Sequence, residues 1–337
     1  MKIGPSKKAA RSRAGLIAGA AALGAAALAL WIESKARRAA RDNPPTGQFL
    51  EVDGVHLHYV DRGEGPAVVL LHGNMVSLKD FEACGLIDRL AQTRRVVAFD
   101  RPGFGHSSRP RDRLWTPAAQ AKLLSAAFRL LDIDRPVVLG HSMGAMVAVE
   151  LGLNHSQDID GLVLLGGYFY PSLRVDALLT APVALPVVGD VMRYTVTPVA
   201  GRLGIKSAVK AMFMPRDIPD DFFPILSREM MLRPIQLRAN AEDAAFMIPA
   251  ARASQLRHHE LQMPVVIVAG ADDRVVDPEA HSVRLHHDLV QGSLAVIPAI
   301  GHMVHYGAID ELVAMIDGQF ALAPAVPLVA EAEASLP

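Results

Sequence analysis

Short apolar runs recur along the chain from residue 49 onward, and stretches with helical periodicity separate them. A run of four or five apolar residues is typical of a strand that is buried on both faces of a sheet. Helical periodicity at residues 117–131 and 143–153 falls between such runs. The predicted buried strands are Val68–Leu71, Val96–Phe99, Val137–Leu139, Leu162–Leu165, Val265–Ala269 and Leu294–Ile297.

Two further strands are predicted at the start of this region, over Phe49–Val52 and Val55–Val60. Asp53-Gly54 joins them, and this dipeptide favours a tight hairpin. An antiparallel start followed by alternating strands and helices predicts an α/β fold. In such a fold, helices cover both faces of a mostly parallel central sheet.

One interval, residues 168–261, breaks this alternation. It has no convincing strand, prolines interrupt it repeatedly, and its Met- and Phe-rich patches have helical spacing. We therefore predict a helical cap over residues 168–261, inserted between the two parts of the core, residues 49–167 and 262–320. The tail at residues 321–337 is rich in Ala, Pro and Glu and is predicted to be flexible.

The N-terminal part of the chain contains an uncharged apolar run over residues 14–32. Nineteen helical residues reach roughly 28 Å, close to the hydrocarbon thickness of a bilayer. The run therefore predicts a transmembrane anchor in the lipid bilayer. A basic segment, residues 1–13, precedes it, and a charged and then turn-rich linker is predicted over residues 33–48.

A cleaved signal peptide is the alternative interpretation of this run, with Ala27-Leu28-Ala29 as a small-residue cleavage motif. The anchor is favoured because the apolar run continues through Leu30, Trp31 and Ile32. Five Lys or Arg residues precede the run and four follow it. This small excess favours an N-terminus inside the cytoplasm and a large domain outside it.

Composition argues against a disordered chain, a nucleic-acid partner and a cysteine-built site. The sequence is 51% apolar, which is too hydrophobic for a disordered chain. Its 34 Lys and Arg and 35 Asp and Glu leave a net charge of −1, which argues against a nucleic-acid partner. Cys84 is the single cysteine, so the sequence excludes an intrachain disulfide and a cysteine-built zinc site.

The strongest chemical signal is Gly140-His141-Ser142-Met143-Gly144, which lies between a predicted strand and a predicted helix. This is the context of a G-x-S-x-G nucleophile elbow. The serine of an elbow occupies a strained turn, and the flanking glycines let neighbouring chain pass without a clash. The turn raises the hydroxyl above the sheet at a helix N-terminus, whose dipole favours developing negative charge.

A serine hydroxyl is a weak nucleophile unless a base takes its proton. His302 follows the last predicted strand and a turn that contains Pro298 and Gly301, so it is the candidate base. A histidine in this role needs a buried carboxylate at its other ring nitrogen. The candidate carboxylates are Asp272, Asp273 and Asp277.

The chain resembles the α/β-hydrolase family over about residues 49–318. His72-Gly73 resembles the loop that completes the family's oxyanion hole, and Asp100–Ser107 resembles the turn after the next strand. Gly270-Ala271-Asp272-Asp273 resembles the segment that bears the acid, and Ile300-Gly301-His302-Met303 resembles the histidine loop. The order Ser, Asp, His along the chain is the order expected of this fold.

The resemblance implies that Asp273 is the acid, because family members place it three residues after the glycine, here Gly270. It also implies that the backbone N–H groups of Asn74 and Met143 bind the oxyanion. Asp272 and Asp277 stay open as alternatives for the acid, and His305 is the next candidate for the base.

These residues favour a serine hydrolase that cleaves a small hydrophobic ester-like substrate through an acyl-enzyme intermediate. The alternative is a hydrolase of carbon–carbon bonds in dienoate ring-cleavage products. Such family members usually have a longer glycine-rich loop after His-Gly than Asn74-Met75-Val76. A second alternative is an inactive, membrane-tethered binding protein. No cofactor and no metal site are predicted. Gly103-Phe104-Gly105 does not match a nucleotide-binding motif, and no third ligand at a recognisable spacing joins the histidine pairs His56 and His58, His258-His259 and His286-His287.

Overall fold

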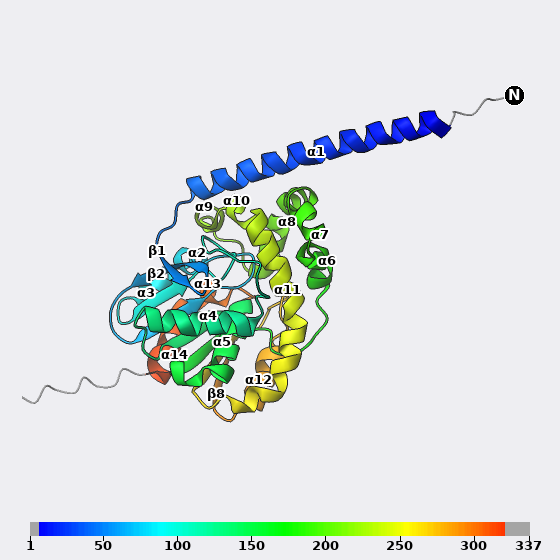
Figure 1. Ribbon diagram of the computed structural model, residues 1–337. Coiled ribbons are helices and arrows are strands. Elements are labelled where there is room, and N and C mark those ends of the chain that lie inside the picture. The colour runs from blue at the N-terminus through cyan, green and yellow to red at the C-terminus, as the bar shows by residue number, and fades with distance from the viewer. Residues whose placement is uncertain (1–6, 321–337) are drawn as a thin grey trace, which may run out of the picture.

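The structure, a computed structural model, describes residues 7–320 of the chain. The predicted tail at residues 321–337 lies outside the described residues, as do residues 1–6 of the predicted basic segment. The described chain forms an α/β core, a group of helices stacked on that core, and a long N-terminal helix that lies across this group (Figure 1).

The core is built on one sheet of eight strands in the order β1-β2-β4-β3-β5-β6-β7-β8. β2 pairs with β1 and with β4 in antiparallel fashion, and the other neighbours pair in parallel. Each strand predicted from an apolar run is present, so the predicted α/β class is confirmed. The strands are β1 (Gln48–Val52), β2 (Val55–Arg62), β3 (Ala67–Leu71), β4 (Arg95–Phe99), β5 (Val137–His141), β6 (Gly161–Leu165), β7 (Val265–Gly270) and β8 (Gly292–Ile297).

The predicted hairpin closes on a two-residue turn. Val52 pairs with Val55, and Asp53 and Gly54 between them have φ angles of 48° and 75°. Positive φ at both central residues is typical of a type I′ turn, whose twist matches that of the two strands.

Both faces of the sheet are buried because successive side chains of a strand point to opposite sides. In β3, Val69 and Leu71 belong to one apolar cluster, and Val68 and Leu70 belong to another. Helices α4 and α5 cover the first cluster, and α3 and α14 cover the second. The core helices are α2 (Lys79–Ala83), α3 (Leu86–Leu90), α4 (Pro117–Leu130), α5 (Met143–Asn154), α12 (Arg284–Asp288), α13 (Val304–Gly307) and α14 (Ile309–Gln319), with short turns η1 (Ser156–Asp158), η2 (Gln255–Glu260) and η3 (Glu279–Val283).

Between β6 and β7 the described chain forms helices and no strand. Phe213 and Phe222 of this interval pack with Val76 and Met303 of two core loops, so the helices sit over the sheet edge that carries those loops. We call these six helices the cap, and their domain boundaries at residues 168–261 stay a prediction. The cap helices are α6 (Val175–Ala184), α7 (Val188–Arg193), α8 (Val196–Phe213), α9 (Phe222–Leu226), α10 (Arg228–Met231) and α11 (Pro234–Ser254).

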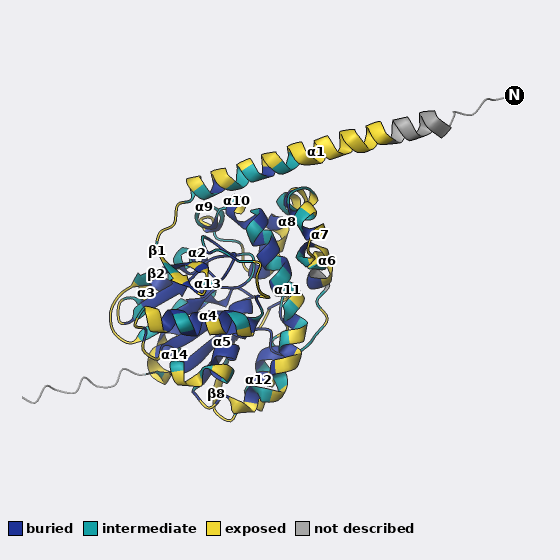
Figure 2. Ribbon diagram, viewed as in Figure 1, coloured by how far each residue is buried: buried dark blue, intermediate teal, exposed yellow. Residues whose placement is uncertain are grey.

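Helix α1 (Lys7–Asp42) contains the apolar run and continues beyond it, so the linker predicted over residues 33–48 begins as helix. Arg37 Nε lies 2.8 Å from Glu33 Oε1, a pair one turn apart that suits a helix. Gly15–Asp42 is the one helical segment of the described residues long and apolar enough to cross a membrane. Its most apolar stretch of 18 residues has a mean hydropathy of 2.0, and 6% of that stretch is buried (Figure 2).

Candidate active site

Ser142 stands at the sharp turn between β5 and α5. Its backbone has φ 53° and ψ −114°, a strained conformation for a residue with a side chain. The Ser142 N–H donates to the Leu165 carbonyl at 2.8 Å, which ties the turn to β6. The predicted elbow is therefore present, with Ser142 at the N-terminal end of α5.

Two glycines make this turn possible. A Cβ atom at Gly144 would collide with the carbonyl oxygen of Leu71, at the end of β3. A Cβ atom at Gly140 would collide with the backbone of Gly144 itself. The elbow packs so closely that glycine is required at both positions.

His302 and Asp273 form a buried pair on the loops after β8 and β7. His302 Nδ1 lies 2.7 Å from Asp273 Oδ2, and the two side chains are 2% and 1% exposed. Oδ1 of Asp273 accepts hydrogen bonds from the N–H groups of Val275 and Val276, at 2.8 and 2.9 Å. An ionised carboxylate only accepts, so Nδ1 of His302 donates and its Nε2 is left to accept a proton.

The electrostatics of this pair favour an ionised Asp273. Burial alone would raise the pKa of its carboxyl, but attraction to His302 and the hydrogen bonds outweigh this effect. The net result is a pKa below the ordinary value, because the charged form is stabilised more than burial penalises it.

The alternative residues are placed elsewhere. Oδ1 of Asp277 accepts from the N–H groups of Glu279 and Ala280, at 2.9 and 3.2 Å, at the start of η3. Asp272 is exposed. His305 is buried, with Nε2 2.8 Å from Asp80 Oδ2. Of the three aspartates, the structure brings Asp273 to His302.

Ser142 and His302 line the same cavity, which has a volume of about 480 Å³. The predicted oxyanion residues Asn74 and Met143 line it too. The structure gives no hydrogen bond from the Asn74 N–H within residues 7–320, and the Met143 N–H begins α5, where a helix has no internal acceptor for it. The other lining residues are Met75, His141, Leu173, Arg174, Thr180, Ala208, Ala211, Met212, Asn240, Ala244, Met247, Arg274 and Val275.

A buried arginine holds the loop that bears Asn74. Arg101 Nε donates to the His72 carbonyl at 2.8 Å, and Nη2 donates to the Gly73 carbonyl and to Asn74 Oδ1, both at 3.0 Å. The pKa of Arg101 is lowered by burial, which nearby Asp243 partly offsets. The loop that bears Asn74 is therefore tied to one guanidinium.

Two cap residues that no sequence pattern predicted complete this support. Asp243 of α11 accepts from Arg101 at 2.5 Å and from Arg109 at 2.9 Å, and all three side chains are fully buried. Asn240 Oδ1 accepts from the Met75 N–H at 2.7 Å. No pattern along α11 distinguishes Asp243 from its neighbour Glu242. The sequence therefore carried no signal that Asp243 pairs with buried arginines.

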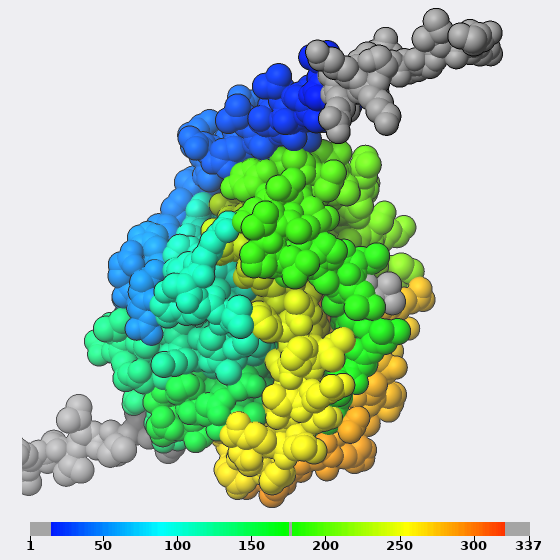
Figure 3. Space-filling model, turned by 45° about the vertical axis from the view of Figure 1, so that its right-hand side comes forward, coloured from blue at the N-terminus to red at the C-terminus, as the bar shows by residue number. Residues whose placement is uncertain are grey.

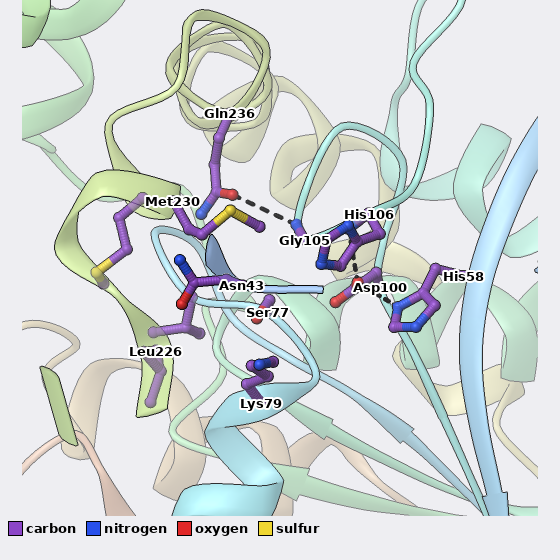
Figure 4. A pocket seen from close by; sticks show the side chains of 12 residues that line it. Asn43, His58, Ser77, Lys79, Asp100, Gly105, His106, Leu226, Met230 and Gln236 are labelled. Atoms are coloured by element: carbon purple, nitrogen blue, oxygen red, sulfur yellow. Dashed lines mark hydrogen bonds and ion pairs between the residues drawn. The ribbon is translucent and has the colours of Figure 1, made fainter. Parts of the chain in front are cut away.

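Asp100 organises the turn beside a second, much smaller cavity (Figure 4). Its carboxylate accepts from the N–H groups of Leu78 and His106, at 2.9 and 2.8 Å, and lies 2.7 Å from His58 Nδ1. The cavity is about 10 Å³, room for a single water molecule. The Gly105 N–H of this turn donates to Gln236 Oε1 of α11 at 3.3 Å, so the turn links strand, loop and cap.

One group within the described residues has the composition of a cation site: Asp80, His141 and His305, whose ligand atoms lie within 4.8 Å of one another. The Asp80 carboxylate already pairs with His305, and all three residues are buried. Burial, His305 and His302 hold the pKa of His141 well below its ordinary value, so this ring stays neutral.

Comparison with known proteins agrees with this architecture. A family model described as alpha/beta hydrolase fold matches residues 66–308. The chain belongs to the alpha/beta hydrolase fold family. The resemblance drawn from the elbow, the acid segment and the histidine loop is thereby confirmed, and the family identifies the chain as a hydrolase.

Curated relatives of this hydrolase differ in what their names state. An uncharacterized protein of Mycobacterium tuberculosis is 29% identical over 279 residues, covering 77% of this chain and 76% of that protein. A 2-hydroxymuconate semialdehyde hydrolase of Pseudomonas putida is 24% identical over 296 residues, covering 86% and 99%. Among solved structures, a thermophilic esterase from Thermogutta terrifontis matches with a TM-score of 0.67 and 22% identity, covering 81% and 98%. That last likeness shows the shared fold.

Proposed function

We propose that this hydrolase cleaves carboxylic esters with Ser142 as nucleophile, His302 as general base and Asp273 as the acid that orients it. The observation that carries the proposal is the buried Asp273–His302 hydrogen bond of 2.7 Å, which borders the cavity that also contains the strained Ser142 elbow. The Nδ1–H group of His302 donates to Asp273, so Nε2 is the ring nitrogen that would accept the Ser142 proton.

The proposed reaction has two stages. Ser142 Oγ attacks the ester carbonyl carbon and passes its proton to His302 Nε2, which then protonates the departing alcohol. Water, deprotonated by the same histidine, next attacks the acyl-serine and releases the acid. The carbonyl oxygen becomes an oxyanion in both stages, and the N–H groups of Asn74 and Met143 would donate to it.

The cavity lining supports a small substrate with a hydrophobic acyl or alcohol group. Met75, Met212 and Met247 contribute flexible apolar side chains, and Ala208 and Ala211 leave room between them.

Carbon–carbon bond hydrolysis of a dienoate is the second candidate. The name of the Pseudomonas putida relative favours it, and so do Arg174 and Arg274, two cationic side chains that line the cavity and suit a carboxylate. The loop after His72-Gly73 lacks a glycine-rich extension, which supports the ester.

The first experiment treats the full chain with a fluorophosphonate probe, which reacts with activated serines. We expect labelling of the native chain, loss of labelling in Ser142→Ala, and normal labelling in Ser207→Ala, an exposed serine of α8. An unlabelled native chain would contradict the proposal and favour an inactive binding protein.

The second experiment compares p-nitrophenyl esters of several chain lengths with 2-hydroxymuconate semialdehyde. We expect efficient turnover of a medium-chain ester. Efficient turnover of the dienoate with hardly any of the esters would replace the first candidate by the second.

Helix α1 would hold this enzyme in a bilayer as a single-span anchor. Its exposed apolar segment supports that role, and its C-terminal half packs against the rest of the protein, where Ile32 and Ala39 are each 3% exposed. With the small excess of cations before the span, the catalytic domain would lie outside the cytoplasm.

A further inference from the structure

The cap carries an exposed apolar surface next to α1. About half of the exposed large apolar side chains of the described residues lie between Leu173 and Leu203, on α6, α7, α8 and the short segments before and between them. Leu179, Val187 and Leu203 are 76%, 72% and 83% exposed. We call this surface the α6–α8 face. A concentration of exposed apolar side chains on one part of a protein is typical of an interaction site.

The length of the apolar run in helix α1 indicates how deep this face lies relative to the bilayer. The uncharged run over residues 14–32 is roughly 28 Å long, so a span uses all of it and Ile32 lies at the edge of the hydrocarbon. The last turn of this same run already contacts the cap. Ile32 is buried, and the Trp31 ring lies 5.4 Å from the Arg202 guanidinium carbon of α8. Arg202 is therefore placed at the level of the lipid headgroups.

Helix α8 has the pattern of a helix that lies in a membrane interface. Val196, Val199 and Leu203 are exposed and spaced by three and four residues, so they form one apolar stripe. Arg202, Lys206 and Lys210 follow at intervals of four along the neighbouring stripe. Arg202 pairs with Glu229 of α10, and both lysines are exposed. Interfacial helices combine such an apolar stripe with Lys and Arg, which attract lipid phosphates.

The direction of α1 agrees with this placement. Its N-terminal half projects past the cap, and α6, α7 and α8 lie on the side toward which it projects (Figure 1). The space-filling view shows the cap surface directly beside α1 (Figure 3). The described part of α1 that projects past the cap is mainly exposed, and α6, α7 and α8 carry exposed residues among intermediate and buried ones (Figure 2).

The active-site cavity meets the α6–α8 face. Leu173 is 78% exposed and also lines the cavity, together with Thr180 of α6 and Ala208 of α8. We propose that the α6–α8 face rests in the headgroup region of the bilayer that anchors α1, so that the cavity takes esters dissolved in the lipid. The docking part rests on the proposed anchoring, and the substrate part rests on the proposed esterase activity.

Docking is tested with single-cysteine variants of the full chain in a Cys84→Ala background, each carrying an environment-sensitive fluorophore. Val187→Cys and Leu203→Cys probe the face, and Leu23→Cys probes the middle of the apolar run. Leu256→Cys is the matched control, because Leu256 is 78% exposed on η2, outside the cap helices. Each protein is reconstituted in phosphatidylcholine vesicles with a nitroxide quencher placed shallow or deep on the acyl chain.

We expect the shallow quencher to reduce fluorescence most at residues 187 and 203, the deep quencher to reduce it most at residue 23, and neither to act at residue 256. Quenching at residue 23 without quenching at 187 and 203 would overturn the docking proposal while leaving the anchor intact. A lack of quenching at residue 23 would overturn the anchor and docking together.

Substrate delivery is tested with Val187→Asp and Leu203→Asp, with Leu256→Asp as control. A long-chain ester dissolved in the vesicles and a short water-soluble ester are compared. We expect the two face variants to lose turnover of the dissolved ester through a higher KM and to keep turnover of the soluble ester. Equal turnover of the dissolved ester by all three variants would overturn delivery. A native chain inactive on both esters would instead contradict the esterase proposal.

Discussion

Arg101 of the core and Asp243 of the cap form an ion pair in which Nη1 lies 2.5 Å from Oδ2, with both side chains fully buried. The same guanidinium donates to the carbonyls of His72 and Gly73. The cap therefore supports the loop that bears Asn74 as well as covering the cavity.

Asp243→Asn should remove a buried charge and leave Arg101 and Arg109 without their shared partner. Breaking a buried pair in this way costs about 3–5 kcal/mol of unfolding free energy. Asp112→Asn is the matched control, because Asp112 and its partner Arg113 are 57% and 39% exposed, so loss of that pair should cost less than about 1 kcal/mol. Urea unfolding of both variants measures the loss of unfolding free energy. Equal losses would contradict a larger contribution of the buried Arg101–Asp243 pair to stability.

Asp273→Asn should lower kcat by about 10⁴-fold with little change in fold, since the amide disturbs the tautomer and orientation of His302. Asp272→Asn, one residue earlier and exposed, should leave kcat unchanged. Steady-state kinetics on an ester measure both. A larger loss in Asp272→Asn would move the acid by one position.

His302→Ala should abolish acylation while the unfolding midpoint stays near that of the native chain. Burst kinetics with an activated ester measure acylation directly. Near-normal acylation would assign the base to another residue, with His305 as the next candidate.

Gly144→Ala should destabilise the elbow, because the added Cβ meets the Leu71 carbonyl and neither backbone can yield without moving a strand. Gly204→Ala is the matched control in α8, where a Cβ meets nothing within 4 Å. Alanine there should raise stability by about 0.5–1 kcal/mol through helix propensity. Thermal unfolding and probe labelling of Ser142 separate the two, and a Gly144→Ala chain that unfolds and labels normally would contradict the packing argument.

Acid should destabilise the protein below about pH 6.5. Burial lowers the pKa of His72 to about 3 and the pKa of His258 and of His281 to about 4. Between the lowered pKa values of the folded chain and about pH 6.5, these histidines are protonated in the unfolded chain and stay neutral in the folded chain. The unfolding free energy therefore falls as pH falls, by about 1.4 kcal/mol per pH unit for each such histidine.

Urea unfolding at several pH values between 7.5 and 5 measures this slope. His258→Gln should reduce the slope by about one proton, whereas Gln262→Ala, at an exposed neighbour without a titratable group, should leave it unchanged. A slope that is the same in both variants would contradict the role of burial at His258.

The full-length chain should resist carbonate extraction from membranes and retain its N-terminal residues. Intact mass spectrometry distinguishes an anchor from a signal peptide cleaved after Ala29. A soluble protein that begins at Leu30 would establish the cleaved form.

Local patterns in the sequence were enough for the eight strands, the hairpin at Asp53-Gly54 and the elbow at Ser142. Strand burial, turn type and glycine requirements depend on neighbours a few positions away, so the order of residues encodes them directly. The spacing of the acid segment also led to Asp273, but through resemblance to the family, since adjacent Asp272 has the same chemistry.

Tertiary structure alone decided which distant groups meet. Arg101 and Asp243 are 142 positions apart, and their contact depends on how α11 packs over the core. The placement of the last turn of the apolar run against α8 depends on α1 continuing as helix to Asp42 and docking on the cap. Such contacts are set by the packing of whole elements in three dimensions, and periodicity along one element carries no record of its partner.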